Sequence, residues 1–224
     1  MSRTVTRAEL RTAAYQRGDF ETKTTRFPSA DLNAYINQSV STFQNFLIGA
    51  WGTDPFETDY AFSTTAGVAT YAAPSDIFQL IRIELNPNNG NRRQTLTPAG
   101  RYERAWLRDG NANHGAYPLH YAYRGSNIEL LPTPAAVYSM TLEYVPATAL
   151  LANDSATLDG VNGWDEWVAV DVARKMATKD ADWALVAELR NDLKEIESRI
   201  RAMAPARDRG ERRVVDVIGM RRRA

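Results

Sequence analysis

The chain has 224 residues, and its 27 Lys and Arg balance its 27 Asp and Glu, so its formal net charge is zero. A hydrophobic fraction of 44% and a charged fraction of 24% are ordinary for a globular protein and exclude disorder over the whole length. The absence of cysteine excludes a disulfide framework, a thiolate zinc site and thiol catalysis. No apolar run approaches 18 residues and the first residues lack a signal-peptide pattern, so we expect no membrane anchor.

The N-terminal part of the sequence predicts two helices. Thr6 and Glu9 have the spacing of a capping box, which predicts a helix near 7–17. Ser29 is the expected N-cap of a second helix, which Gly52 ends. Apolar residues recur along this second helix at steps of three or four: Leu32, Ile36, Val40, Phe43, Leu47 and Trp51.

From residue 53 to about 148 the pattern changes from helical to β-rich. Eight of the ten prolines lie there, and turn residues separate short strand candidates. Those candidates are 60–62, 68–71, 77–85, 92–97, 117–123, 127–131 and 137–145. A short helix is expected around 100–107, and alternation places Ile77, Gln79, Ile81, Ile83 and Leu85 on one face of a strand. Six or seven short strands indicate a small antiparallel sandwich or barrel.

The segment 164–203 has no proline or glycine, and it predicts a helical hairpin or a kinked pair of helices and not one straight helix. Asp182 is expected to cap its second helix. That helix carries a heptad seam of apolar residues: Val186, Leu189, Leu193, Ile196, Ile200 and Met203. Trp164, Trp167 and Trp183 could stack a ligand, but tryptophans at helical spacing are more typical of a core or a subunit interface.

After Pro205 the sequence becomes basic. Residues 205–224 hold seven arginines against three acidic residues, a local charge of 7 − 3 = +4. The β-prone stretch 214–218 cannot form a core alone, so it is either solvated or adds to a partner as an extended peptide. The residues that we single out for partner binding are Arg207, Arg209, Arg212, Arg213, Val214, Val215, Asp216, Val217 and Ile218.

Catalytic, metal and cofactor sites find little support in the sequence. His114 and His120 lack the further ligands that zinc requires, and glycine-rich nucleotide motifs are absent. Four carboxylates could form glycosidase pairs, but nothing in the sequence fixes the distance between them. The preference of a helix N-terminus for negative charge explains two of the four. These carboxylates are Asp54, Glu57, Asp165 and Glu166. We therefore expect no catalytic residue, metal or cofactor.

Several sequence blocks follow one another in a fixed order along most of the chain. They are 60–71 running into 74–76, then 121–134, 141–146, 164–168, and a basic tail that includes 214–216. In this order they resemble the head-to-tail connector (adaptor) proteins of tailed bacteriophages, over about residues 29–218. Each block is a turn, a strand or a helix start, so the ordered set carries the resemblance.

The resemblance implies an α+β fold, namely a helical bundle with an inserted antiparallel β-sandwich-like domain and an extended C-terminal tail. The N-terminal helices of the bundle are expected in 1–52 and the inserted domain in 53–148. The C-terminal helical hairpin is expected in 149–204. The tail 205–224 is expected to dock on the portal.

The resemblance also implies a non-enzymatic virion protein of the head-to-tail neck, assembled in the host cytoplasm. Its expected form is a ring, commonly of twelve copies, beneath the portal. Its partners would be the portal protein and a downstream tail, stopper or nozzle protein, and DNA would pass without sequence-specific binding. Two alternatives remain open. One is a carbohydrate-binding or cell-wall-hydrolysing module, an activity credited to some relatives, and the other is nucleic-acid binding by the arginine tail.

Overall fold

The computed structural model describes residues 4–86, 93–108, 117–160 and 163–207. The chain folds into two compact units, a helical unit of Met1–Gly52 with Leu150–Ala224 and a β unit of Thr53–Ala149. The fold class is α+β, as the sequence predicted. In the part of the chain that the structure describes, no helix has the length and apolar character needed to cross a bilayer.

The first two helices begin and end close to the predicted residues. The capping box of α1 (Arg7–Arg17) is confirmed, because the Thr6 hydroxyl accepts from the Glu9 amide and the Glu9 carboxylate accepts from the Thr6 amide. The prediction that Ser29 caps α2 (Ser29–Trp51) is wrong, since extended Pro28 is the N-cap and Ser29 is already helical. The Pro28 carbonyl accepts from the Asp31 and Leu32 amides, and this helix start has no side-chain cap.

The predicted helical hairpin is confirmed as α4 (Asp165–Lys179) and α5 (Trp183–Arg207). The Asp182 carboxylate accepts from the Leu185 amide at 3.1 Å, as expected of an N-cap. The backbone of α5 runs two residues past Pro205, where the sequence predicted the tail to begin. A proline in the last turn removes one backbone hydrogen bond without preventing the helical φ that its ring already holds.

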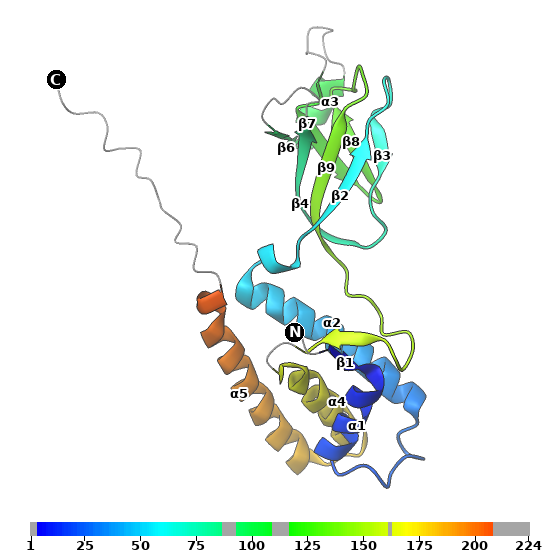
Figure 1. Cartoon of the computed structure of the whole chain (residues 1–224), viewed down its shortest axis with the longest axis vertical. Coiled ribbons are helices and arrows are strands. Elements are labelled where there is room, and N and C mark those ends of the chain that lie inside the picture. Colours follow the sequence, from blue (N-terminus) through cyan, green and yellow to red (C-terminus); the bar gives the residue numbers. More distant parts are fainter. Residues whose placement is uncertain (1–3, 87–92, 109–116, 161–162, 208–224) are drawn as a thin grey trace, which may run out of the picture. The chain divides into compact units, whose positions relative to one another are not determined.

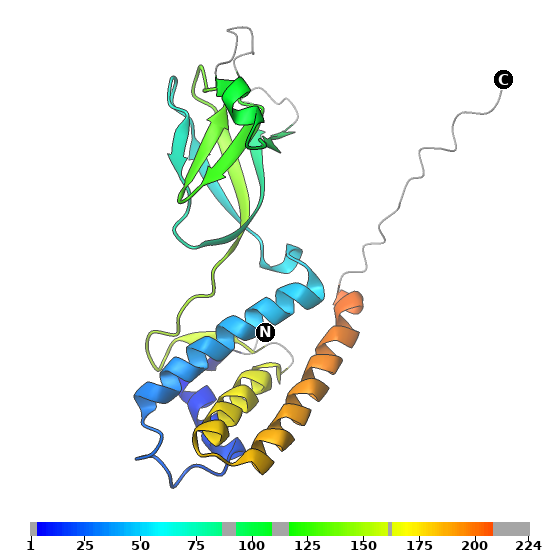
Figure 2. The same ribbon diagram turned by 180° about the vertical axis from the view of Figure 1, so that it is seen from behind.

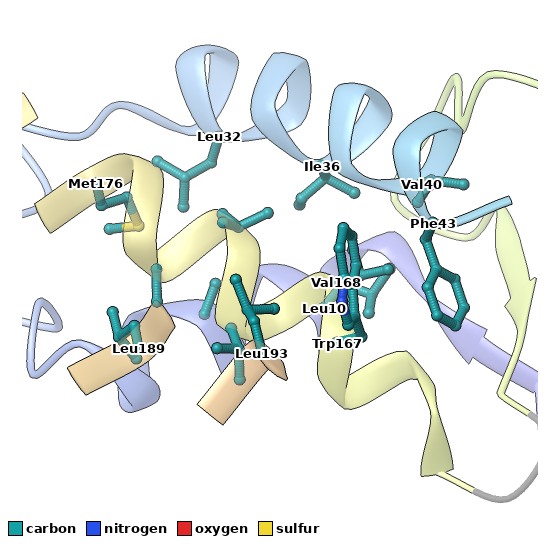
Figure 3. Close-up of a cluster of buried hydrophobic side chains, with 14 of the residues drawn as sticks. Leu10, Leu32, Ile36, Val40, Phe43, Trp167, Val168, Met176, Leu189 and Leu193 are labelled. Atoms are coloured by element: carbon teal, nitrogen blue, oxygen red, sulfur yellow. The ribbon is translucent and has the colours of Figure 1, made fainter. Parts of the chain in front are cut away.

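The helix α4 is central, because it packs against α1, α2 and α5 (Figures 1 and 2). Its surface is therefore buried over most of its circumference, which is more than the one apolar face of an amphipathic helix. Figure 3 shows side chains of α1, α2 and α5, among them Leu10, Ile36 and Leu193, beside those of α4. The predicted seam of α5 is buried from Val186 to Ile200, whereas its last member, Met203, is 49% exposed.

A short ribbon that the sequence did not predict closes the N-terminal side of the helical unit. The strand β1 (Thr4–Thr6) pairs in antiparallel fashion with β10 (Thr157–Asp159). Asp154 reinforces the same connection by accepting from Arg7 at 2.7 Å and from Arg11 at 2.9 Å. The start of the chain is thus held to the segment that leads into α4.

The two Asp154 ion pairs make the stability of the fold depend on pH in the acidic range. Hydrogen bonds from Arg11 and Arg7 lower the pKa of Asp154 from 3.8 to about 2. A carboxylate whose pKa is lowered in the folded state stabilises the fold above its unfolded pKa, and this contribution is lost as the pH falls through the folded pKa. The window for this residue therefore runs from about pH 4 down to about pH 2.

We expect the Asp154→Asn variant to be less stable than the parent near neutral pH and to approach the parent as the pH falls through that window. The variant lacks the charge whose contribution the parent itself loses in acid. Urea unfolding followed by circular dichroism at a series of pH values measures the difference in unfolding free energy. A difference that stays constant between about pH 5 and pH 2 would contradict the role given to Asp154.

The described part of the β unit holds two four-stranded sheets, ordered β2-β9-β4-β5 and β3-β8-β7-β6. Their inner faces share one apolar core, which includes Ile83, Leu142 and Ile128. The strands are β2 (Thr58–Ser63), β3 (Thr70–Ala72), β4 (Ile77–Asn86), β5 (Gln94–Thr95), β6 (Thr97–Pro98), β7 (His120–Arg124), β8 (Asn127–Leu131) and β9 (Ser139–Pro146). A 3-10 turn, η1 (Asp54–Phe56), precedes β2, and α3 (Glu103–Arg108) lies between β6 and β7.

The β unit differs from the sequence prediction in several places. The predicted strand 92–97 is divided, because its described residues form β5 and β6, which belong to different sheets. The pair β6–β7 is parallel, because the connection through α3 is long enough to act as a crossover. In β4, register shifts between Ile77 and Gln79 and between Leu80 and Arg82 break the predicted alternation. Leu80 therefore packs against the core while Gln79 is exposed, as expected where an extra residue shifts the strand by one position.

Candidate functional site

Trp167 lies in the core of the helical unit. Its side chain is 4% exposed, and its ring stacks on Phe43 with centroids 5.3 Å apart (Figure 3). The indole N–H donates to Glu197 on α5 at 3.3 Å, so the polar atom of this buried ring has a partner. Contacts within a single subunit therefore account for the burial of Trp167.

Trp164 and Trp183 lie at the starts of α4 and α5. Trp164 is half-buried against Trp51, with ring centroids 4.6 Å apart, whereas Trp183 is 66% exposed. The 15 residues of α4, about 22 Å of helix, run between the positions of these two tryptophans in the hairpin. Trp164 and Trp183 therefore do not form one stacking platform with Trp167. A subunit interface at Trp183 stays a prediction.

A groove opens between the start of α4 and the second half of α5, with a volume of about 330 Å³. We call it the α4–α5 groove, and its lining residues are Gly163, Trp164, Glu166, Ile196, Arg199 and Met203. Apolar side chains provide much of its wall, and a carboxylate and a guanidinium stand beside them. Glu166 forms an ion pair with Arg17 of α1, which fixes one side of the opening.

Most of the residues predicted for partner binding lie outside the described part of the chain. Arg207 is the last residue of α5, so its backbone is helical and it stands four residues after Met203. The others, Arg209, Arg212, Arg213, Val214, Val215, Asp216, Val217 and Ile218, follow it in the sequence beyond the described residues. Their role in docking therefore remains a prediction from the sequence.

The four carboxylates that could form glycosidase pairs lie in different units. Asp54 and Glu57 belong to the β unit, and Glu57 accepts a hydrogen bond from the Thr53 hydroxyl at 2.7 Å. Asp165 and Glu166 belong to the first turn of α4 in the helical unit, where the helix dipole favours negative charge. Glu57, Asp165 and Glu166 thus have local structural explanations.

The two histidines do not meet in a described site. His120 starts β7, and its Nδ1 lies 2.6 Å from the Thr97 hydroxyl of β6, while His114 lies outside the described residues. Among the residues whose positions are given, no group of three or more His, Asp or Glu side chains could hold a metal ion.

A buried carboxylate that the sequence prediction missed joins α2 to α4. Asp171 is 4% exposed, accepts from Ser39 at 2.7 Å, and pairs with Arg174 at 2.6 Å and Lys175 at 3.0 Å. Burial alone would raise the pKa of Asp171, but the Ser39 and Arg174 hydrogen bonds and the Lys175 charge together hold it below its usual value. The signal in the sequence was an acid followed at three and four residues by bases, inside an apolar helix.

Comparison with protein families gives a match that spans both units. The model of the SU10 adaptor protein family matches residues 5–216, which includes every described helix and strand apart from the first residue of β1. A comparison with curated proteins finds no match. The family is one of structural phage adaptors and not of enzymes. Because the match covers nearly the whole chain, the protein belongs to the SU10 adaptor protein family, and it is a bacteriophage head-to-tail adaptor.

Proposed function

We propose that this adaptor forms a closed ring, of twelve copies, beneath the portal and links the capsid to the tail at the virion neck. The observation that carries the proposal is the family match, which extends through both units and into the basic segment as far as Asp216. An adaptor role requires one surface for the portal and another for the next tail protein. Repeated head-to-tail contacts between identical subunits close into a ring when their rotation allows it.

The segment 205–224 is the element of this ring that docks on the portal. It combines a charge of +4 with the β-prone stretch 214–218. The segment is too short and too basic to form a hydrophobic core by itself. An extended peptide of this kind gains backbone hydrogen bonds by adding to a partner's sheet, while its arginines pair with carboxylates. The entropic cost of ordering the segment is offset when it contacts the portal, which favours assembly after the portal is in place.

The neutral charge of the chain suits a channel through which DNA passes without sequence-specific binding. Strong attraction between lumen arginines and phosphates would retard passage, since each neutralised phosphate adds to affinity. We therefore expect a lumen without a continuous belt of unpaired arginines. A reconstruction that shows such a belt would contradict this part of the proposal.

Mixing the purified chain with purified portal rings tests the proposed assembly. Electron microscopy of the mixture is expected to show a second ring stacked coaxially on the portal, and native mass spectrometry is expected to give twelve adaptor chains. Assembly in the host cytoplasm is tested by recovering the same complex from infected cells before lysis. Adaptor chains that bind elsewhere on the capsid, or that never close into a ring, would refute the proposal.

A further inference from the structure

The apolar seam of α5 extends beyond the side chains that cover it. Its members from Val186 to Ile200 are at most 8% exposed, whereas Met203 is 49% exposed. Met203 lines the α4–α5 groove together with the half-buried ring of Trp164 and the otherwise buried Ile196. The groove therefore offers apolar surface at the end of the helical unit from which residues 208–224 continue.

The chain that follows α5 is long enough to return to this groove. From Arg207 back to Ile196 is eleven residues of helix, or about 16 Å. The six residues 208–213 span up to about 20 Å when extended, so they can carry residue 214 back along α5. The next apolar residues of the sequence, Val214, Val215, Val217 and Ile218, come directly after this span.

We infer that, in the free subunit, residues 214–218 of the same chain occupy the α4–α5 groove. Their apolar side chains cover Met203 and the ring of Trp164, and the flanking arginines lie beside the carboxylate of Glu166 at the opening. A connection of six residues gives the segment an effective concentration of about millimolar, so its own groove outcompetes that of a neighbouring copy at micromolar protein concentrations.

The inference deepens the proposed function and rests on it in one respect. If 214–218 also docks on the portal, the α4–α5 groove holds the portal-binding segment until the portal competes for it. A subunit in this state has no free extended segment that could add to another copy. Association between adaptor subunits before they meet the portal is therefore reduced. Portal binding then releases the segment and uncovers the groove at the same moment.

The absence of cysteine from the natural sequence gives a direct test on the full chain. The double variant Met203→Cys with Val217→Cys places one thiol on the groove and one in the segment. The control is Ala202→Cys with Val217→Cys, because Ala202 is exposed and lies about 100° around the helix from Met203. The separation along the chain is nearly the same in the two variants, so only the face of α5 differs.

In a glutathione buffer without portal, we expect the intrachain disulfide to form at least tenfold more favourably in the 203/217 variant than in the control. Peptide mass spectrometry after proteolysis measures both populations. Equal populations would overturn the inference, and so would disulfides that form mainly between chains, which would assign the groove to a neighbouring copy's segment.

A second variant separates this inference from the proposed function. Met203→Glu puts a charge on an exposed wall of the groove, so the core of the helical unit is unaffected. If nine in ten free subunits hold the segment, releasing it raises the apparent affinity for portal by up to about tenfold. Unchanged affinity in a chain that binds portal would count against the inference. Complete absence of portal binding in the parent chain would refute the proposed function and leave the disulfide result standing.

Discussion

Removal of residues 208–224 is expected to lower the affinity of the adaptor for portal by at least about 100-fold. The deletion takes away six arginines and the whole β-prone stretch 214–218. Loss of a few central contacts of an interface, each worth about 2 kcal/mol or more, produces a change of this size. Biolayer interferometry on immobilised portal rings measures it.

The truncated chain is expected to fold as the full chain does. The apolar cores of the helical unit and of the β unit are built within residues 5–200, so the deletion removes none of their members. Its thermal midpoint should therefore lie within a few degrees of the parent's. A matched control replaces Arg221, Arg222 and Arg223 with serine and keeps 214–218, which separates loss of charge from loss of the apolar stretch. Undiminished binding by the truncated chain would refute the role given to the tail.

The substitution Trp167→Ala is expected to lower the free energy of unfolding by about 3–5 kcal/mol. The indole is buried among α2, α4 and α5, stacks on Phe43 and donates to Glu197. Its removal leaves a cavity that the surrounding helices cannot fill completely, and it removes the hydrogen bond that Glu197 accepts from the indole. Urea unfolding monitored by circular dichroism gives the change.

Trp183→Ala is the matched control for this prediction. The side chain of Trp183 is 66% exposed, so its loss should change the unfolding free energy of the isolated chain by no more than about 0.5 kcal/mol. If Trp183 belongs to a subunit interface, the same substitution weakens the ring on the portal without affecting the free subunit. Equal destabilisation by the two substitutions would contradict the assignment of Trp167 to the core.

The sequence predicted the helices well because their signals are local. A capping box, a step of three or four and a heptad seam each depend on residues within two turns of one another. The structure confirms the capping box of Thr6 and Glu9, the cap at Asp182, and the buried seam that starts at Val186. The exposure of Met203 could not be predicted, because it depends on where the neighbouring helices stop and not on α5 itself.

The parts that the sequence did not reveal depend on contacts between distant segments. The β1–β10 ribbon joins residues about 150 positions apart, and three-residue strands carry too little pattern to be recognised. Asp154 binds Arg7 and Arg11 across a similar separation. In β4, the register shifts alter which side chains face the core although the alternation in the sequence is continuous. The partner-binding residues remain predictions because contacts with another polypeptide would define them.

The first and last long strands of the β unit are neighbours in one sheet. Thr58 near its beginning pairs with Tyr144 near its end, so the two points where the unit joins the rest of the chain lie within a few strand spacings of each other. A short Gly-Ser bridge could therefore replace the whole of Thr53–Ala149 and leave the helices to fold as before. We therefore expect the β unit to be exchangeable, and chimeras that carry a different β unit would show which properties of the adaptor depend on it.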